Sequence, residues 1–460
     1  MYNAQQFHDI LIIGAGLSGL STAHFLSKMA PDLKILLVEK SDRVGGVIKS
    51  HCANGYLAEH GPHGYLNNVE ESRELLADLK LEESTQEASL NQFIRYLCLG
   101  GKLNPIPQHP LKIITSDILP LSKKLRVLAD LWKSVDQNEQ TVADWVQHRF
   151  GSALLPFADA VLTGIYAGDI KKLSLDAVFP GIRQLERRFG SVIRAAIKSR
   201  KKGKIKGLPS MLSFTNGMEE LVIKLAEDKT IQFNKGISAI EYASKKWTIQ
   251  AEDSQTFRAN KIIIATNINH GLRLLSQLAP PPVNKVPEAH LANIVMGFKS
   301  NKVKIPHGFG YLAPQKEKRF SLGTLFSTRM FPNRAPKDRE MIEVLVGGRH
   351  HPDRLQLDDD ELINQAYDDV SQLIELNEFP IYTKVIRTKT SFPQLELGHL
   401  KLQAYKDQTE SRFDGLFITG FGWMGIGVND MIKSSKSTAS RLISGDSGLA
   451  GIAKAKGIYF

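Results

Sequence analysis

Gly14, Gly16 and Gly19 stand at the spacing G-x-G-x-x-G, and Glu39 follows 20 residues after the last of them. At this spacing the first glycine allows a tight turn, the second lets backbone approach a pyrophosphate, and the third lets a helix pack closely on a strand. A carboxylate at the later position can accept both hydroxyl groups of a ribose. The set therefore predicts a dinucleotide-binding site.

Strand and helix patterns flank these glycines. His8–Ile13 is a short apolar run of the buried parallel-strand type, Leu20–Met29 has helical spacing, and Lys34–Val38 is a second buried run. Together they predict one βαβ unit with the glycine loop at the start of its helix. Helix amide groups and the helix dipole would favour phosphate charge at that loop.

Three further segments favour FAD over NAD. Arg43-Val-Gly-Gly46 allows a second close approach of backbone to the phosphates, and it resembles the R-x-G-G element of FAD proteins of the amine oxidase and protoporphyrinogen oxidase superfamily. Ile262–Thr266 resembles the strand that closes over FAD there. Gly420–Gly427 follows a buried strand and opens a helix, which can aim amide groups at the flavin, where negative charge develops on reduction.

The cofactor-binding residues predicted from these segments come from six stretches of the chain. They are Gly14, Gly16, Leu17, Ser18, Gly19, Glu39, Lys40, Arg43, Gly45, Gly46, Gly61, Pro62, His63, Gly64, Ile237, Ala265, Thr266, Gly420, Trp423, Gly427, Val428 and Asn429. No metal ligand is predicted. The two cysteines, Cys52 and Cys98, provide neither a disulfide framework nor a thiolate metal cluster.

Secondary-structure patterns divide the rest of the chain. At 460 residues it exceeds the size of one ordinary core. Helical patterns dominate residues 91–206, and strand patterns return after them. Predicted helices cover 124–135, 141–151, 358–374 and 429–442, and predicted strands cover 231–242, 246–250, 261–266 and 415–420.

The predicted fold class is α/β with three domains. A discontinuous Rossmann-like FAD-binding domain of the p-hydroxybenzoate hydroxylase and amine oxidase type is assigned to residues 1–75, 207–275 and 405–460. A mixed-sheet substrate domain is assigned to 76–90 and 276–404, and an inserted α-helical domain to 91–206. This division follows from the wide separation of the three FAD-type segments.

The charge of the chain predicts an anionic partner. The net charge is +11 and the pI is about 9.3, and Lys198–Lys206 holds six basic residues in nine positions. No nucleic-acid recognition motif accompanies this charge. No apolar run approaches the length that spans a bilayer, and no presequence pattern opens the chain. We therefore expect a cytoplasmic protein whose Leu154–Tyr166 and Lys198–Lys206 segments contact a membrane peripherally.

Further blocks occur in order through the middle of the chain. They are Glu59–Pro62, Arg95–Leu103 with Pro105 and Pro107, Gly164–Asp169, Leu173-Ser174, Gly308–Leu312, Leu322–Leu325, Met330–Pro336 and Gly347-Gly348. With the FAD-type segments, these blocks resemble the protoporphyrinogen oxidase family over nearly the whole length. The resemblance implies an FAD enzyme of late haem biosynthesis that removes hydrogen from a meso carbon of a reduced tetrapyrrole, with three two-electron steps giving the aromatic porphyrin.

The resemblance also implies substrate-binding residues. Arg95 corresponds to an arginine that binds a propionate, a role suited to a planar guanidinium that stays charged. The predicted apolar walls around the macrocycle are Leu312, Leu322, Phe331 and Val346. Two positions depart from the family pattern. His63 stands where arginine or asparagine is common, as a second candidate carboxylate contact, and Phe421 stands where a small residue or asparagine is common.

The sequence leaves several alternatives open. The substrate is protoporphyrinogen IX or coproporphyrinogen III, and the electron acceptor is oxygen or a quinone. An amine oxidase or carotenoid desaturase shares the fold, although a cysteinyl flavin is disfavoured because no cysteine follows Cys98. A flavin-binding protein without turnover is the remaining alternative. No general base is assigned, because the flavin carries the redox chemistry. The oligomeric state is not predicted.

Overall fold

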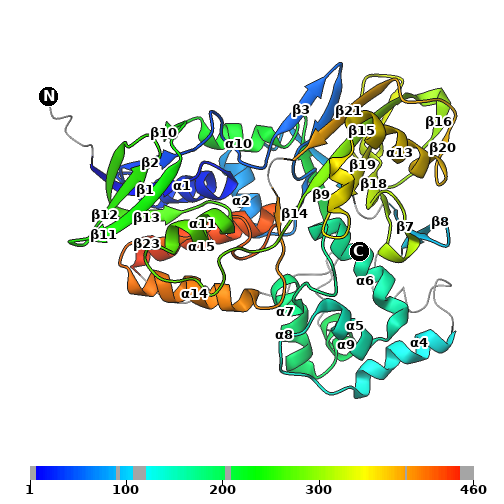
Figure 1. The fold of residues 1–460 in the computed structure, drawn as a ribbon, viewed down its shortest axis with the longest axis horizontal. Coiled ribbons are helices and arrows are strands. Elements are labelled where there is room, and N and C mark those ends of the chain that lie inside the picture. The colour runs from blue at the N-terminus through cyan, green and yellow to red at the C-terminus, as the bar shows by residue number, and fades with distance from the viewer. Residues whose placement is uncertain (1–6, 90–93, 107–120, 202–208, 389–390, 446–460) are drawn as a thin grey trace.

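The computed structural model describes residues 7–89, 94–106, 121–201, 209–388 and 391–445. It contains two seven-stranded sheets and a separate group of helices. Figure 1 shows the first sheet and its helices on one side, the second sheet beside them, and the helical part below.

The first sheet combines strands from the start, middle and end of the chain. The strand order is β10-β2-β1-β13-β12-β11, with β23 also paired to β13. β1, β2, β10, β13 and β23 are mutually parallel, while β11 and β12 form an antiparallel extension. The strands are β1 (Phe7–Ile13), β2 (Ile35–Val38), β10 (Ile231–Gln232), β11 (Ile237–Ala243), β12 (Lys246–Ala251), β13 (Thr256–Ile264) and β23 (Leu416–Ile418).

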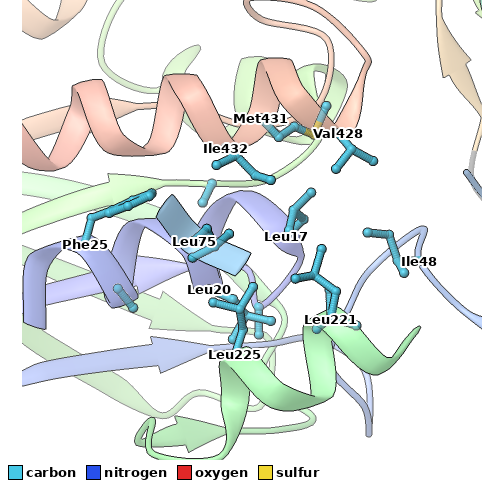
Figure 2. Packing of buried hydrophobic residues seen from close by; sticks show 14 of the residues in the cluster. Leu17, Leu20, Phe25, Ile48, Leu75, Leu221, Leu225, Val428, Met431 and Ile432 are labelled. Atoms are coloured by element: carbon cyan, nitrogen blue, oxygen red, sulfur yellow. The ribbon is translucent and has the colours of Figure 1, made fainter. Parts of the chain in front are cut away.

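Helices cover both faces of this sheet. α1 (Leu17–Met29), α2 (Glu70–Asp78), α10 (Glu219–Ala226) and α15 (Val428–Ser444) share one apolar core on the first face. Figure 2 shows Leu17 and Leu20 of α1 packed between Ile432 of α15 and Leu225 of α10. α11 (Ile268–Leu275) and α14 (His399–Arg412) cover the second face. Residues more than 400 positions apart therefore build one core.

The second sheet is mixed, and it includes residues expected elsewhere. Its order is β21-β15-β19-β18-β17-β7-β8. We assigned 91–206 to the helical domain, but 95–106 form β7 and β8 of this sheet, because β7 finds a parallel partner in β17. α13 (Asp359–Ser371) packs on one face of the sheet. The strands are β7 (Arg95–Leu99), β8 (Lys102–Ile106), β15 (Leu291–Lys299), β17 (Gly310–Leu312), β18 (Gly323–Leu325), β19 (Arg339–Gly347) and β21 (Tyr382–Arg387).

Four small sheets and several short helices complete the two sheet-based parts. The small sheets pair β3 with β4, β14 with β22, β16 with β20, and β9 with both β5 and β6. Their strands are β3 (Ser50–Ala53), β4 (Tyr56–Glu59), β5 (Tyr65–Leu66), β6 (Thr85–Ser89), β9 (Ser210–Phe214), β14 (Glu288–Ala289), β16 (Val303–Lys304), β20 (Glu375–Leu376) and β22 (Phe392–Pro393). The short helices are η3 (Ser300–Lys302), η4 (Gln315–Glu317), α12 (Ser327–Met330), η5 (Pro332–Arg334) and η6 (Pro352–Gln356).

The helical part is held together by buried ion pairs as well as apolar contacts. Arg149, fully buried, contacts Asp130 at 3.0 Å and Glu186, and Arg183 joins the same Glu186. Such pairs fix the geometry of a small core, because losing one partner strands a buried charge. The helices are α4 (Leu121–Leu128), η1 (Ala129–Trp132), α5 (Val142–Arg149), η2 (Ser152–Leu154), α6 (Leu155–Tyr166), α7 (Leu175–Val178), α8 (Pro180–Phe189) and α9 (Val192–Lys201).

Several predicted elements differ from the structure in extent. The helix expected at 124–135 ends at Leu128 and continues as the 3-10 turn η1, and the strand expected at 231–242 is divided into β10 and β11. The helix at Thr141 forms as expected, with the Thr141 hydroxyl accepting from the Asp144 amide. Residues 202–206 of the basic run lie outside the described residues.

Most apolar residues of α6 are buried or half-buried, whereas Ile165 is exposed. Phe157, Ala160, Leu162 and Tyr166 are all buried, in cores shared with the second sheet and with neighbouring helices. Packing therefore explains most of the apolar character of Leu154–Tyr166, and the predicted membrane contact of this segment stays a prediction. Among the described residues, no helix combines the length and apolarity needed to cross a bilayer.

Candidate functional site

The glycine loop joins β1 to α1, and two of its glycines have no room for a side chain. A Cβ atom on Gly19 would lie 1.9 Å from the carbonyl oxygen of Gly14, and one on Gly14 would lie 3.1 Å from that of Ala265. Gly14 also has a φ of +106°, which L side chains rarely adopt. By contrast, a Cβ on Gly16 meets only the Cα of Gly46 within 4 Å, at 3.9 Å. The backbone at Gly16 is therefore the part of the loop that a ligand can approach.

The start of α1 is fixed from inside the protein. Gly16 is the N-cap residue and no side chain caps the helix there, so first-turn amide groups can serve an anion at Gly16. Leu17 and Ser18 are buried. The Ser18 carbonyl accepts from the Ser435 hydroxyl of α15 at 2.9 Å. Leu17 and Ser18 thus contribute backbone at this site, while their side chains pack inward.

Glu39 follows β2 and its carboxylate is held by three donors. Oε2 accepts from the Ala15 amide at 2.8 Å, and Oε1 accepts from the Ser41 amide at 3.0 Å and from the Ser41 hydroxyl at 2.8 Å. Glu39 is only 7% exposed, so this geometry is rigid. Oε1 thus accepts two hydrogen bonds and Oε2 accepts one, which leaves a lone pair on Oε2 to accept a ribose hydroxyl. The neighbouring Lys40 is exposed.

Arg43 supports the second glycine turn from within. Its guanidinium donates to the carbonyl oxygens of Val44 at 2.8 Å, Gly46 at 2.6 Å and Ile48 at 3.1 Å. Gly45 and Gly46 both have positive φ, and the Gly45 amide donates to Ala15 at 2.9 Å. The arginine therefore shapes the turn that faces Gly16.

The segment from Gly61 to Gly64 leads from β4 towards the second sheet. A Cβ on Gly61 would lie 2.4 Å from the Val47 carbonyl oxygen, and one on Gly64 would lie 2.5 Å from that of Leu212. Pro62 between them is half-buried. His63 Nε2 lies 2.9 Å from Glu343 Oε2, in a contact that the sequence analysis did not anticipate.

The middle and late segments converge on the glycine loop. The Ala265 amide donates to Ile13 at 2.9 Å, and a Cβ on Gly420 would lie 2.2 Å from the Thr266 carbonyl oxygen. Ile237, at the start of β11, is buried, and its carbonyl accepts from Arg273 at 3.3 Å. The structure thus brings the predicted segments around residues 14, 265 and 420 together.

The C-terminal segment presents backbone more than side chains. Trp423 is fully buried in the core beneath α11, so its indole is a packing group. Val428 packs into the core of α1 and α15. Asn429 is engaged by Leu66, whose carbonyl accepts from Nδ2 at 2.9 Å, and by the Ser72 hydroxyl. Gly427 is the N-cap residue of α15, and its amide donates to Asp430 at 3.2 Å.

These features fit a dinucleotide of the FAD type. The uncapped start of α1 beside Gly16 suits a pyrophosphate, and the fixed Glu39 carboxylate suits a ribose. Bound FAD would supply two-electron oxidation chemistry. The residues of the chain would hold its phosphates by backbone amides and its ribose by a carboxylate. Among the described residues, no group of three or more His, Cys, Asp or Glu side chains is arranged to hold a metal ion.

One face of the second sheet is turned towards the FAD-type domain. Strand pairing puts Arg95, Gly310, Leu325 and Glu343 in one row across four strands. Residues paired in this way point to the same side of a sheet. Val295, the next residue in the row, packs against β4, whose residues belong to the predicted FAD-binding domain. We refer to this side of the second sheet as the shared face.

Arg95 stands at one end of the row. Its guanidinium carbon lies 5.1 Å from the centre of the Phe309 ring, and burial lowers its pKa to about 10, so it is charged at neutral pH. Phe331 packs with Phe309 and Leu325 at the same end. Arg95 and Phe331 therefore both pack against Phe309.

The remaining predicted wall residues do not share one surface. Leu312 lies on the shared face and packs against Gly164 of α6. A Cβ added to Gly164 would lie 2.8 Å from the Leu312 side chain. Leu322 packs with Ala167 and with Leu345. The prediction that Val346 forms part of this wall is wrong. Val346 is fully buried on the opposite face of β19, in the core beneath α13, because strand side chains alternate; Leu345 occupies the shared face.

A buried polar cluster is the main feature that the sequence analysis missed. Glu343 accepts from His63, from the Ser327 hydroxyl at 2.7 Å and from Asn293 Nδ2. Beside it, Arg334 pairs with Glu59 at 2.8 Å. The signal available in sequence was an isolated glutamate in the apolar run of β19, since a carboxylate is rarely buried without a partner.

Comparison with protein families decides the relationship. The model for flavin containing amine oxidoreductases matches residues 17–443. The chain belongs to this family. The predicted fold class, the FAD cofactor and the oxidoreductase activity are thereby confirmed.

Named relatives of this flavin oxidoreductase cover nearly the whole chain. Coproporphyrinogen III oxidase of Bacillus subtilis (strain 168) is 26% identical, over 94% of this chain and 97% of the relative. Protoporphyrinogen oxidase 2, chloroplastic/mitochondrial, of Arabidopsis thaliana is 28% identical, over 95% and 94% respectively. The resemblance inferred from the sequence blocks is confirmed.

Solved structures extend the comparison to the fold. A protein from Exiguobacterium sp. 255-15, proposed to be a protoporphyrinogen oxidase, has a TM-score of 0.78 to this flavin oxidoreductase at 20% identity and covers 95% of this chain and 99% of its own. Reduced UDP-galactopyranose mutase has a TM-score of 0.72 at 15% identity, with 96% and 95% covered. At these identities the likeness shows the fold alone.

Proposed function

We propose that the chain catalyses the FAD-dependent, six-electron oxidation of protoporphyrinogen IX to protoporphyrin IX in porphyrin biosynthesis. The observation that carries the proposal is the shared face, where Arg95 stands beside apolar side chains and opposite the FAD-type domain. The relatives described above, named for porphyrinogen oxidation, support the same reaction class.

The proposed roles of the chain are binding and orientation. Arg95 would hold a propionate as a charged, hydrogen-bonded pair, and Leu312, Leu325 and Leu345 would cover the apolar macrocycle. Leu322 and Phe331 would support that surface from behind. Fixing the substrate against the cofactor lowers the entropic part of the barrier without a dedicated base.

Coproporphyrinogen III is the second candidate substrate. It carries four propionates, and the Bacillus subtilis relative is named for it. His63, at the far end of the row from Arg95, would give a further carboxylate a basic partner. Oxygen or a quinone would reoxidise the cofactor.

Anaerobic mixing of the FAD-loaded protein with each porphyrinogen tests the proposal. Bleaching of the visible flavin band on mixing, with porphyrin fluorescence appearing under air, is the expected result. The porphyrinogen that bleaches the flavin band at the higher rate is then assigned as the substrate. Bleaching by amines, with neither porphyrinogen active, would replace the proposal by an amine oxidase activity. A flavin that photoreduces but is not reoxidised by air or quinones would indicate a protein without turnover.

We also propose peripheral contact with the cytoplasmic face of an anionic membrane, through α4 and η1. Trp132 is 78% exposed and Leu125 is 63% exposed, and α4 carries Lys123 and Lys124. An exposed tryptophan among basic residues suits a lipid interface. Co-sedimentation with anionic but not zwitterionic vesicles is expected, with a loss of binding in Trp132→Ala. Equal sedimentation of the wild-type protein and the Trp132→Ala variant with anionic vesicles would show that this surface does not bind the membrane.

A further inference from the structure

Glu343 and His63 form an ion pair across the two sheet-based parts. Glu343 lies in β19 of the second sheet, and His63 lies in the Gly61–Gly64 segment that follows β4. Their closest atoms, Glu343 Oε2 and His63 Nε2, are 2.9 Å apart. The glutamate side chain is 2% exposed and the histidine side chain is 17% exposed. The imidazole is therefore the member of the pair that an outside group can reach.

The hydrogen bonds of Glu343 favour an ionised carboxylate. Asn293 Nδ2 and the Ser327 hydroxyl both donate to it. Asn293 Nδ2 also donates to the Glu59 carbonyl at 3.1 Å, which fixes the orientation of the amide. A buried carboxylate that accepts from all its neighbours carries a negative charge, and that charge must be balanced nearby.

His63 is the cation that balances Glu343. The charged groups that act on His63 are Glu343, Glu59 and Arg334. Arg334 already pairs with Glu59 at 2.8 Å and donates to the Ser213 hydroxyl, so that pair is neutral by itself. Burial lowers the pKa of His63, but the Glu343 carboxylate outweighs this effect and raises the pKa above its ordinary value. His63 pulls the pKa of Glu343 well below its usual range in return.

The pair lies on the same face as Arg95. Arg95 and Glu343 belong to one cross-strand row, separated by Gly310 and Leu325. Three inter-strand steps of about 4.8 Å separate their backbones. The shared face thus has a permanent cation at one end and a titratable cation at the other, with small and apolar residues between them.

We infer that Glu343 is a positioning residue that holds His63 as a cation facing an anion at the shared face. This inference rests on the proposed function. The anion is either a carboxylate of the substrate or the negative charge of the reduced cofactor, which present the same chemistry to an imidazolium. Glu343 acts only through His63, whereas His63 would touch the anion.

The inference fixes the direction of the pH dependence. His63 is cationic below its raised pKa, so the attraction between His63 and the anion is lost as the pH rises through that pKa. In Glu343→Gln the largest charge that opposes the burial effect is removed, so the pKa of His63 falls and the attraction to the anion is lost at lower pH. His63→Arg keeps a cation at every pH in the working range.

Nitrogen NMR of histidine-labelled, FAD-loaded protein tests the pair without turnover. The His63 signal, assigned by its disappearance in His63→Gln, is expected to titrate at least one pH unit lower in Glu343→Gln than in the wild-type protein. Glu340→Gln is the matched control, because Glu340 lies on the same strand, points to the other face and pairs with Arg329. An unchanged His63 titration in Glu343→Gln overturns the inference, whatever substrate the enzyme uses.

Two further measurements identify the anion. If it is a substrate carboxylate, KM for the porphyrinogen rises about tenfold as His63 deprotonates, and His63→Arg removes this rise while the flavin reduction potential stays constant. If it is the reduced cofactor, the reduction potential of FAD falls instead, and again not in His63→Arg. Constant KM and constant potential in all variants would overturn the inference. His63→Arg retains the ion pair, so it serves as the test if Glu343→Gln does not fold.

Discussion

The two large sheets present charge to a ligand in different ways. At the first sheet the groups aimed at a ligand are backbone amides of the glycine loop and one carboxylate, Glu39, held by backbone and by Ser41. At the second sheet they are side-chain ions, Arg95 and the His63–Glu343 pair. The proposed first site depends on the absence of side-chain atoms at its glycines, and the proposed second site depends on side-chain charges, Arg95 and the His63–Glu343 pair.

This difference separates the consequences of substitution. Added atoms should destroy the first site, because backbone cannot move away from a new side chain. Removed charges should weaken the second site but leave cofactor binding intact. The variants below test that contrast, from the largest expected effect to the smallest.

Gly19→Ala is expected to abolish FAD binding. The new Cβ would lie 1.9 Å from the Gly14 carbonyl oxygen, so α1 must move away from the loop that holds the pyrophosphate. The purified variant should be colourless and should gain no flavin absorbance after incubation with excess FAD. Gly100→Ala is the control for backbone strain away from the first sheet, because Gly100 has a φ of +63° but an added Cβ there meets nothing within 4 Å. A yellow Gly19→Ala protein would contradict the backbone account of this site.

His399 makes the first region sensitive to acid. It is buried beside the C-terminal segment, Nε2 lies 3.4 Å from the Trp423 carbonyl oxygen, and burial lowers its pKa to about 4. Between pH 6.5 and pH 4 the unfolded chain binds a proton that the folded chain does not. The contribution of His399 to the free energy of unfolding therefore has its full value above pH 6.5, and the free energy of unfolding falls by about 3 kcal/mol by pH 4.

Thermal unfolding of His399→Gln checks this expectation. The glutamine can still donate to Trp423 but does not titrate, so the loss of Tm on acidification should be smaller than in the wild-type protein. Other titrating groups are common to both proteins and cancel. Parallel losses of Tm would show that His399 contributes nothing to the acid response.

Arg95→Ala is expected to raise KM for the porphyrinogen about 10- to 100-fold, the cost of losing a charged hydrogen bond. FAD content and kcat should change little, because Arg95 lies in the second sheet. Arg95→Lys should recover part of the loss, since the charge returns without the planar fork. Steady-state kinetics with FAD-saturated enzyme measures both variants, and an unchanged KM in Arg95→Ala would remove Arg95 from the substrate site.

Leu345→Ala and Val346→Ala test the two faces of β19 against each other. Leu345 lies on the shared face, so its truncation should raise KM a few-fold. Val346 lies in the core beneath α13, so its truncation should lower stability by about 2 kcal/mol and leave KM unchanged. Equal effects of the two variants on KM would contradict the alternation described here.

Sequence predicted the first region well because its information is local. A glycine spacing, a buried strand on each side and a carboxylate at the end of the second strand specify one geometry. Trp423 and Arg43 were placed in the right segments, but the structure shows that one packs in the core and the other supports a turn. Spacing identifies a segment without deciding whether its side chain or its backbone faces the ligand.

The second region was predicted less well because its information is distant. Both faces of β19 are mainly apolar, so no polar alternation indicated that Leu345 and not Val346 would lie on the shared face. β7 and β8 precede a helical stretch, and only pairing with β17 reveals them as part of the sheet. Glu343 and His63 are 280 positions apart, and nothing local links them.

The hydrogen bond from the Ser435 hydroxyl to the Ser18 carbonyl joins α15 to α1, and this has a consequence for folding during synthesis of the chain. α1 is translated early, but the helix that covers it, α15, emerges more than 400 residues later. At about 5 to 20 residues per second, the ribosome needs roughly 20 to 80 s to deliver it. During that interval the nascent βαβ unit exposes the apolar side of α1, so the cofactor half of this enzyme is completed only near the end of synthesis.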